Sequence, residues 1–176
     1  RVGAAGAPEG KDFRISGRTA TADDRAPAVA SDGLSFLVVW QDSRLLPNRQ
    51  SDIYGRIVSA AGKPAGANFR ICGPQATGWD WVPAITWDGT LPAYLVVWQD
   101  ERNWADRGAD IYGRRVDGTG ARVGGDFRIS GPDATTYEYS PDLAFSGSGH
   151  LVVWQDSRDE ATRARDIWGR RVALSV

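Results

Sequence analysis

The chain has 176 residues, 41% of them hydrophobic and 24% charged, which suits one domain with a substantial core. Lys and Arg number 21 against 22 Asp and Glu, so the net charge of −1 favours neither nucleic acid nor an anionic membrane surface as partner. No apolar run approaches the length of a membrane span, and we therefore expect no membrane insertion.

The chain opens with a segment that has no sheet of its own. Residues 1–16 read RVGAAGAPEGKDFRIS, and the pattern returns at 115–130 as RVDGTGARVGGDFRIS. At 115–130 the pattern closes a repeat unit through a Gly-rich turn and a final strand. We therefore predict that residues 1–16 carry a left-over fourth strand.

Three repeat units follow, at about 17–72, 73–130 and 131–172, within a single repeat domain that covers 1–176. Each unit is expected to be all-β, since aromatic residues alternate with many Gly and Pro turns and no stretch shows helical periodicity. The third unit stops after its third strand. The predicted strands lie at 26–31, 36–42, 52–58 and 68–72, at 82–87, 94–100, 110–116 and 126–130, and at 140–146, 150–156 and 166–172.

The second strand of each unit contains LVVW, beginning at Leu37, Leu95 and Leu151. A sheet with one solvated face would alternate apolar and polar residues, so this continuous run predicts burial on both faces. A four-stranded sheet packed on both faces is what a blade of a β-propeller requires.

The unit VVWQD…DIYG…RV…G…FRIS resembles the blade repeats of bacterial secreted or surface β-propeller proteins, and DIYG is similar to strands of TolB-type propellers. The resemblance implies a propeller that is extracellular or at the cell surface. Three blades are too few for a ring. We therefore predict a homodimer that closes one six-bladed ring, with the N-terminal strand of each protomer completing the third blade of the other. The alternative fold is a β-trefoil.

The repeated polar residues have two interpretations. Asp42, Asp100 and Asp156 each precede an arginine by two positions, and a further Asp opens each third strand. Two carboxylates per unit could hold calcium. The favoured interpretation is that each Asp is clamped by Arg and backbone donors at a strand end, so no cofactor and no metal site is expected. Cys72, the only cysteine, matches Ser16 and Ser130 in the sibling repeats and makes no metal site alone.

The linkers and loops that differ between repeats are the expected ligand site, since they gather on one face of a propeller. Aromatic rings beside carboxylates and guanidiniums suit sugars, although the same rings could pack between blades. The candidate ligand-binding residues are Trp79, Asp80, Trp81, Trp104, Arg107, Tyr137, Glu138 and Tyr139.

We therefore expect a non-catalytic, lectin-like module that binds a glycan or a protein. The alternative is a structural or protein-interaction propeller that forms a fragment of a larger surface protein. An enzyme is less favoured, because a site repeated in every unit has no single asymmetric centre. No catalytic residue is assigned: the one histidine, His150, has no triad partner in a recognisable motif.

Overall fold

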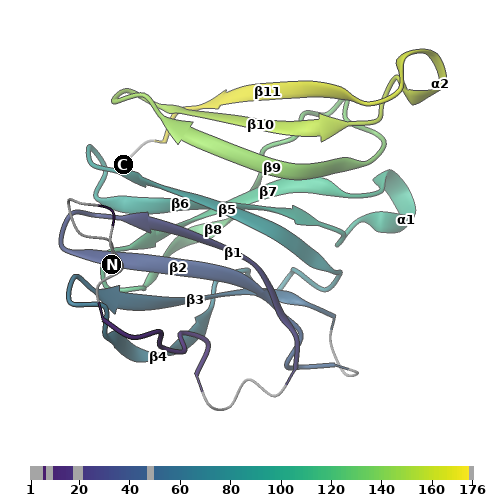
Figure 1. Ribbon diagram of the computed structural model, residues 1–176. Helices are drawn as coiled ribbons and strands as arrows, with labels where there is room; N and C mark the ends of the chain where they lie inside the picture. Colours follow the sequence, from purple (N-terminus) through teal and green to yellow (C-terminus); the bar gives the residue numbers. More distant parts are fainter. Residues whose placement is uncertain (1–5, 7–9, 18–21, 47–49, 175–176) are drawn as a thin grey trace.

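The computed structural model describes residues 6, 10–17, 22–46 and 50–174 (Figure 1). Their strands form three antiparallel sheets, one for each repeat unit, which we call blades 1, 2 and 3. Blades 1 and 2 have four strands and blade 3 has three. The strands are β1 Asp24–Ser31, β2 Ser35–Asp42, β3 Asp52–Ser59, β4 Pro64–Arg70, β5 Asp80–Asp88, β6 Ala93–Asp100, β7 Asp110–Asp117, β8 Arg122–Arg128, β9 Glu138–Phe145, β10 His150–Asp156 and β11 Asp166–Val172.

Each blade is a simple meander, with consecutive strands hydrogen-bonded in chain order. The first strands of the blades contact one another, β1 against β5 and β5 against β9, so the blades turn about a common inner edge (Figure 1). This arrangement confirms the prediction of an all-β propeller with three blades per chain and excludes the β-trefoil. The ring is not closed within this chain.

The second strand of the middle blade shows why its apolar run is continuous. All eight residues of β6 are buried. Val96 and Trp98 belong to the core between blades 1 and 2. Leu95 and Val97 belong to the core between blades 2 and 3. Successive side chains of one strand thus fill two different cores, as the sequence predicted.

Blade 3 has a neighbour on one face only, and its exposure shows the consequence. Leu151 is 50% exposed, whereas Leu95 at the same repeat position is fully buried. In β11 the apolar side chains of Ile167 and Trp168 are also exposed. Within the described residues, blade 3 therefore has an uncovered face, and no fourth strand pairs with β11.

The N-terminal segment lies on blade 1 in the way that the end of blade 1 lies on blade 2. Phe13 packs against Gly62, as Phe69 packs against Gly120. Asn68 donates a hydrogen bond to the carbonyl of Ser16, and Arg56 donates one to the carbonyl of Ile15 at 2.9 Å. Residues 10–17 form no strand here, and the rest of the predicted strand, 1–5 and 7–9, lies outside the described residues.

Two four-residue helices, α1 Trp104–Arg107 and α2 Glu160–Arg163, occur in the loops after the second strands of blades 2 and 3. Sequence periodicity does not detect them, because each is a single turn. Neither has the length and hydropathy needed to cross a bilayer, and the described residues contain no other helix. The fourth strands also begin four residues earlier than predicted, at Pro64 and Arg122.

Candidate functional site

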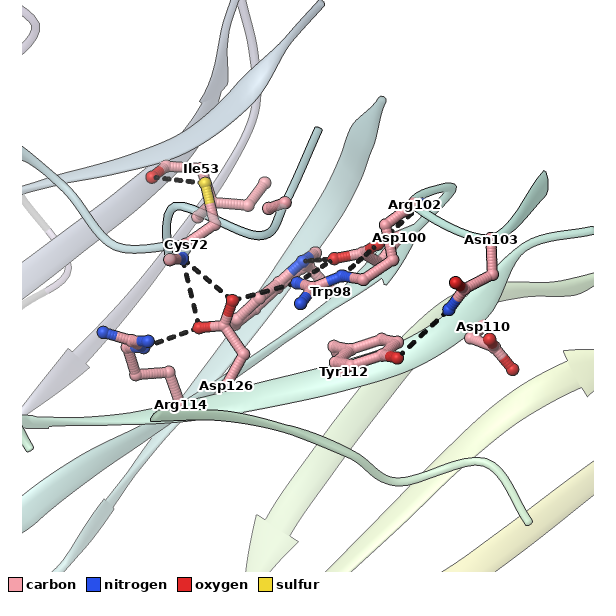
Figure 2. Close-up of polar contacts among 12 residues, drawn as sticks. Ile53, Cys72, Trp98, Asp100, Arg102, Asn103, Asp110, Tyr112, Arg114 and Asp126 are labelled. Atoms are coloured by element: carbon pink, nitrogen blue, oxygen red, sulfur yellow. Dashed lines mark hydrogen bonds and ion pairs between the residues drawn. The ribbon is translucent and has the colours of Figure 1, made fainter. Parts of the chain in front are cut away.

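The aspartate that ends each second strand is held by donors of its own repeat. Asp100 accepts hydrogen bonds from Trp98 Nε1 at 2.9 Å, from the backbone N–H of Arg102 at 2.9 Å and from Arg102 Nε at 2.8 Å (Figure 2). The Arg102 guanidinium also stacks 4.0 Å above the Tyr112 ring. Asp42 and Asp156 are held by equivalent partners.

These contacts give the repeated motif a structural role. Burial alone would raise the pKa of Asp156, but hydrogen bonds from Arg158 and Trp154 hold that pKa below its usual value. The carboxylate therefore stays ionised while it fixes the strand end and the loop that follows. This agrees with the interpretation that the repeated Asp and Arg residues belong to the scaffold.

The unrepeated aromatic residues do gather on one face, around the start of β5 and β9. Trp79 and Trp81 stack with ring centroids 5.0 Å apart, and Tyr137 and Tyr139 stack at 5.8 Å. Trp104 of α1 contacts Tyr137 at 5.0 Å, which joins the loops of blades 2 and 3. Five of the eight candidate ligand-binding residues thus form an aromatic surface of two ring groups, Trp79 with Trp81 and Trp104 with Tyr137 and Tyr139.

Beside this surface lies a pocket of about 390 Å³, lined by Gln50, Trp79, Glu101 and Trp104. The Glu101 carboxylate accepts hydrogen bonds from Trp81 Nε1 at 3.1 Å and from Gln99 Nε2 at 3.5 Å. Burial raises the pKa of Glu101 and outweighs these two donors. A carboxyl group with a raised pKa therefore lines a space bounded by two indole rings.

The remaining candidates lie apart from this pocket. Arg107 forms an ion pair with Asp110 at 3.4 Å. Asp80 and Glu138 begin β5 and β9 but are fully buried between the blades. Burial, with the nearby Asp110 and Asp156 carboxylates, raises the pKa of Glu138 to about 8. In the Trp-x-Trp and Tyr-x-Tyr segments, the central carboxyl group thus lies in a junction between blades, while the flanking rings stack together outside it.

Sequence reasoning missed Glu101 as a site residue, although the signal was present. The repeated octet reads LVVWQDSR at 37–44 and 151–158 but LVVWQDER at 95–102. Ser43 and Ser157 occupy the position of Glu101, and all three backbone N–H groups donate to a carbonyl that precedes the first strand of their blade. The repeated fold uses only the backbone N–H of the residue at this position. Its side chain differs between the repeats, and only blade 2 places a carboxyl group there.

Searches against known protein families and against curated proteins find no match. Solved structures do match the fold. They include a thermostable family-43 glycoside hydrolase, with 13% identity and a TM-score of 0.58 over 88% of this chain and 56% of that one. An α-L-arabinofuranosidase from Lactobacillus brevis matches with 12% identity and a TM-score of 0.54 over 84% of this chain and 52% of its own.

The catalytic domain of an α-L-arabinofuranosidase from Coprinopsis cinerea matches 94% of this chain, with 10% identity and a TM-score of 0.54, over 49% of its own length. The chain thus spans about half the length of these structures. At such low identity the likeness shows the fold. The expectation of a non-catalytic, lectin-like module is overturned, because these three structures with the same fold are glycoside hydrolases.

Proposed function

We propose that this chain is part of a catalytic, carbohydrate-active propeller that cleaves glycosidic bonds, with the pocket at Glu101 as a sugar subsite. The observation that carries the proposal is the Glu101 carboxyl, whose pKa burial raises, in a pocket between Trp79 and Trp104. Indole rings stack on the C–H face of a sugar ring, and a protonated carboxyl can donate a proton to a glycosidic oxygen.

Glycoside hydrolysis needs a second carboxyl group to act as base or nucleophile. Glu160 of α2 is our candidate within the chain. Its carboxylate is 57% exposed and pairs with Arg165 at 3.8 Å, and both Glu160 and Glu101 act on the pKa of Tyr139. The charges of both glutamates therefore act on the same part of the aromatic surface.

Ring closure by a second copy belongs to the same proposal. The N-terminal segment packs on blade 1 in the position of a preceding blade's last strand, while β11 lacks a fourth strand. An exchanged N-terminal strand would supply the strand that β11 lacks and cover an exposed edge. Light scattering at micromolar concentration should give a dimer mass. A monomer mass would refute closure by a second copy.

The repeat resemblance to bacterial secreted and surface propellers supports an extracellular or cell-surface location, where polysaccharides are found. The structural neighbours are named for arabinose- and xylose-containing substrates, so arabino- and xylo-oligosaccharides form the first test panel. The assay measures reducing ends released by the purified chain.

The decisive variants are Glu101→Gln and Glu101→Ser. Loss of a general acid typically lowers kcat by about 100-fold or more. Glu101→Ser restores the octet of the sibling repeats, which fold with serine at this position, and so controls for misfolding. We expect both variants to lose hydrolysis and to keep the wild-type melting temperature. A wild-type chain that cleaves no member of the panel, or a Glu101→Ser variant with full activity, would overturn the proposal.

A further inference from the structure

The junction between blades 1 and 2 contains a cluster of metal-ligating groups that the pocket at Glu101 does not use. A carboxylate oxygen of Asp52, the Cys72 thiol and a carboxylate oxygen of Asp80 all lie within 4.8 Å of one another. All three residues are buried, with at most 2% of each exposed. They come from three places: the start of β3, the residues just after β4 and the start of β5.

Asp80 provides a second, independent observation. Its side chain is completely buried, and neither carboxylate oxygen has a hydrogen-bond partner among the described residues. A buried carboxyl group without partners costs several kcal/mol in most settings, so folded proteins seldom leave one unused. Here the group is directed at a thiol and a second carboxylate.

The Cys72 thiol is also weakly held. Its sulfur lies 3.9 Å from the carbonyl oxygen of Ile53 (Figure 2). It also lies 3.5 Å from Asp52 Oδ1, and a thiol is only a weak donor. Thiolate and carboxylate together suit zinc, which binds sulfur and oxygen ligands and accepts three protein ligands with water in the fourth position. We infer that Asp52, Cys72 and Asp80 form a divalent metal site, best matched to Zn²⁺, that joins blade 1 to blade 2.

The charges of the junction agree with a divalent ion. Ionised Asp52, Cys72 and Asp80 would carry three negative charges, and Arg70 balances one of them through its 2.6 Å pair with Asp52. The nearby Asp100 is already paired with Arg102 at 2.6 Å. A divalent cation would neutralise the two negative charges that remain.

The junction between blades 2 and 3 provides the internal control. There, Ser130 and Glu138 replace Cys72 and Asp80, and Ser130 Oγ donates to Asp110 Oδ1 at 3.0 Å. The second junction therefore has the same backbone but no thiolate. The site is a property of Cys72 and Asp80 and not of the repeated scaffold.

Cobalt is the probe, because Co²⁺ bound to a thiolate gives a near-ultraviolet charge-transfer band that oxygen-only sites lack. After treatment with chelator, the full chain should bind about one Co²⁺ with this band, and Zn²⁺ should displace it. Cys72→Ser should remove the band, and Asp80→Asn, which keeps the shape of the side chain but removes a carboxylate ligand, should weaken binding about 100-fold. Glu138→Gln, at the second junction, should leave the band unchanged.

A gain-of-site variant keeps the test valid if Cys72→Ser folds poorly. Ser130→Cys combined with Glu138→Asp turns the second junction into a copy of the first and should bind two Co²⁺ ions per chain. The inference is overturned if the wild-type chain shows no thiolate band at stoichiometric Co²⁺, or if Cys72→Ser retains it. None of these outcomes depends on hydrolytic activity, so failure here and failure of the proposed function are separate results.

Discussion

Blade 1 meets blade 2, and blade 2 meets blade 3, through the same set of contacts. At each junction an arginine of the fourth strand pairs with the first aspartate of the third strand, Arg70 with Asp52 at 2.6 Å and Arg128 with Asp110 at 2.5 Å. The same arginine also donates to a carbonyl in the linker, at Ala76 or Ala134. This shared frame ties the third and fourth strands of one blade to the linker that leads to the next.

The two junctions differ in how the polar groups inside the frame are satisfied. Ser130 Oγ donates to Asp110 and accepts from the N–H of Ile111 at 3.2 Å, so the second junction has a connected hydrogen-bond network. At the first junction Cys72 replaces this serine with a weak donor. One repeat scaffold thus holds a serine hydroxyl bonded to an aspartate at one junction and a set of potential metal ligands at the other. Two side chains decide which chemistry is present.

The largest effect should come from removing Asp110, the aspartate that accepts the hydrogen bond from Ser130. Asp110→Ala would leave Arg128 and Arg107 without their partner, and loss of one member of a buried ion pair costs about 3–5 kcal/mol. Asp52→Ala should cost less in chelator, because Asp52 lacks the serine hydroxyl that Asp110 receives. Urea unfolding measures both, with the exposed Asp106→Ala as a control expected to change stability by less than about 0.5 kcal/mol. An equal or larger loss for Asp52→Ala would contradict this ranking.

The pH dependence of the free energy of unfolding should reveal the contribution of the Glu138 carboxyl group at the second junction, apart from that of the surrounding frame. The pKa of Glu138 rises from 4.5 to about 8 on folding, so between these values the folded chain binds a proton that the unfolded chain does not. Stability from this group is therefore lost as pH rises, by up to about 1.4 kcal/mol per pH unit. Glu138→Gln should remove this slope and be the more stable protein at pH 8, with little difference near pH 4.5. Identical pH profiles for the two proteins would show that Glu138 is ionised in the folded state.

The sequence predicted the blades well because their signal is repeated and local. LVVW at Leu95 implied burial on both faces, and the side chains from Leu95 to Trp98 were found alternately in the two cores. The clamp at Asp100 was also predictable, since Asp, Trp and Arg lie within five positions of one another.

The junctions were not predictable in the same way, because their residues come from separate strands. Cys72 has no ligand partner nearby in the sequence, yet the packing of blade 2 on blade 1 brings Asp80 and Asp52 to it. Asp80 was assigned to the outer ligand surface because it lies between Trp79 and Trp81. A bulge in β5 after Trp81, with Val82 at a φ of 45°, belongs to a repeated irregularity that periodicity alone does not reveal.

The smallest expected effect is the exchange of cysteine and serine between the junctions, measured as the free energy of unfolding in chelator. Ser130→Cys should cost about 1 kcal/mol, because the sulfur replaces hydroxyl hydrogen bonds to Asp110 and Ile111 with weaker contacts. Cys72→Ser should be neutral or slightly stabilising, since a serine hydroxyl can donate to Asp52 as Ser130 does to Asp110. If the two exchanges change the free energy of unfolding equally, the difference between the junctions must lie in Asp80 and Glu138. The double variant Ser130→Cys/Glu138→Asp would then show whether the cysteine position or the carboxyl position makes the junctions differ.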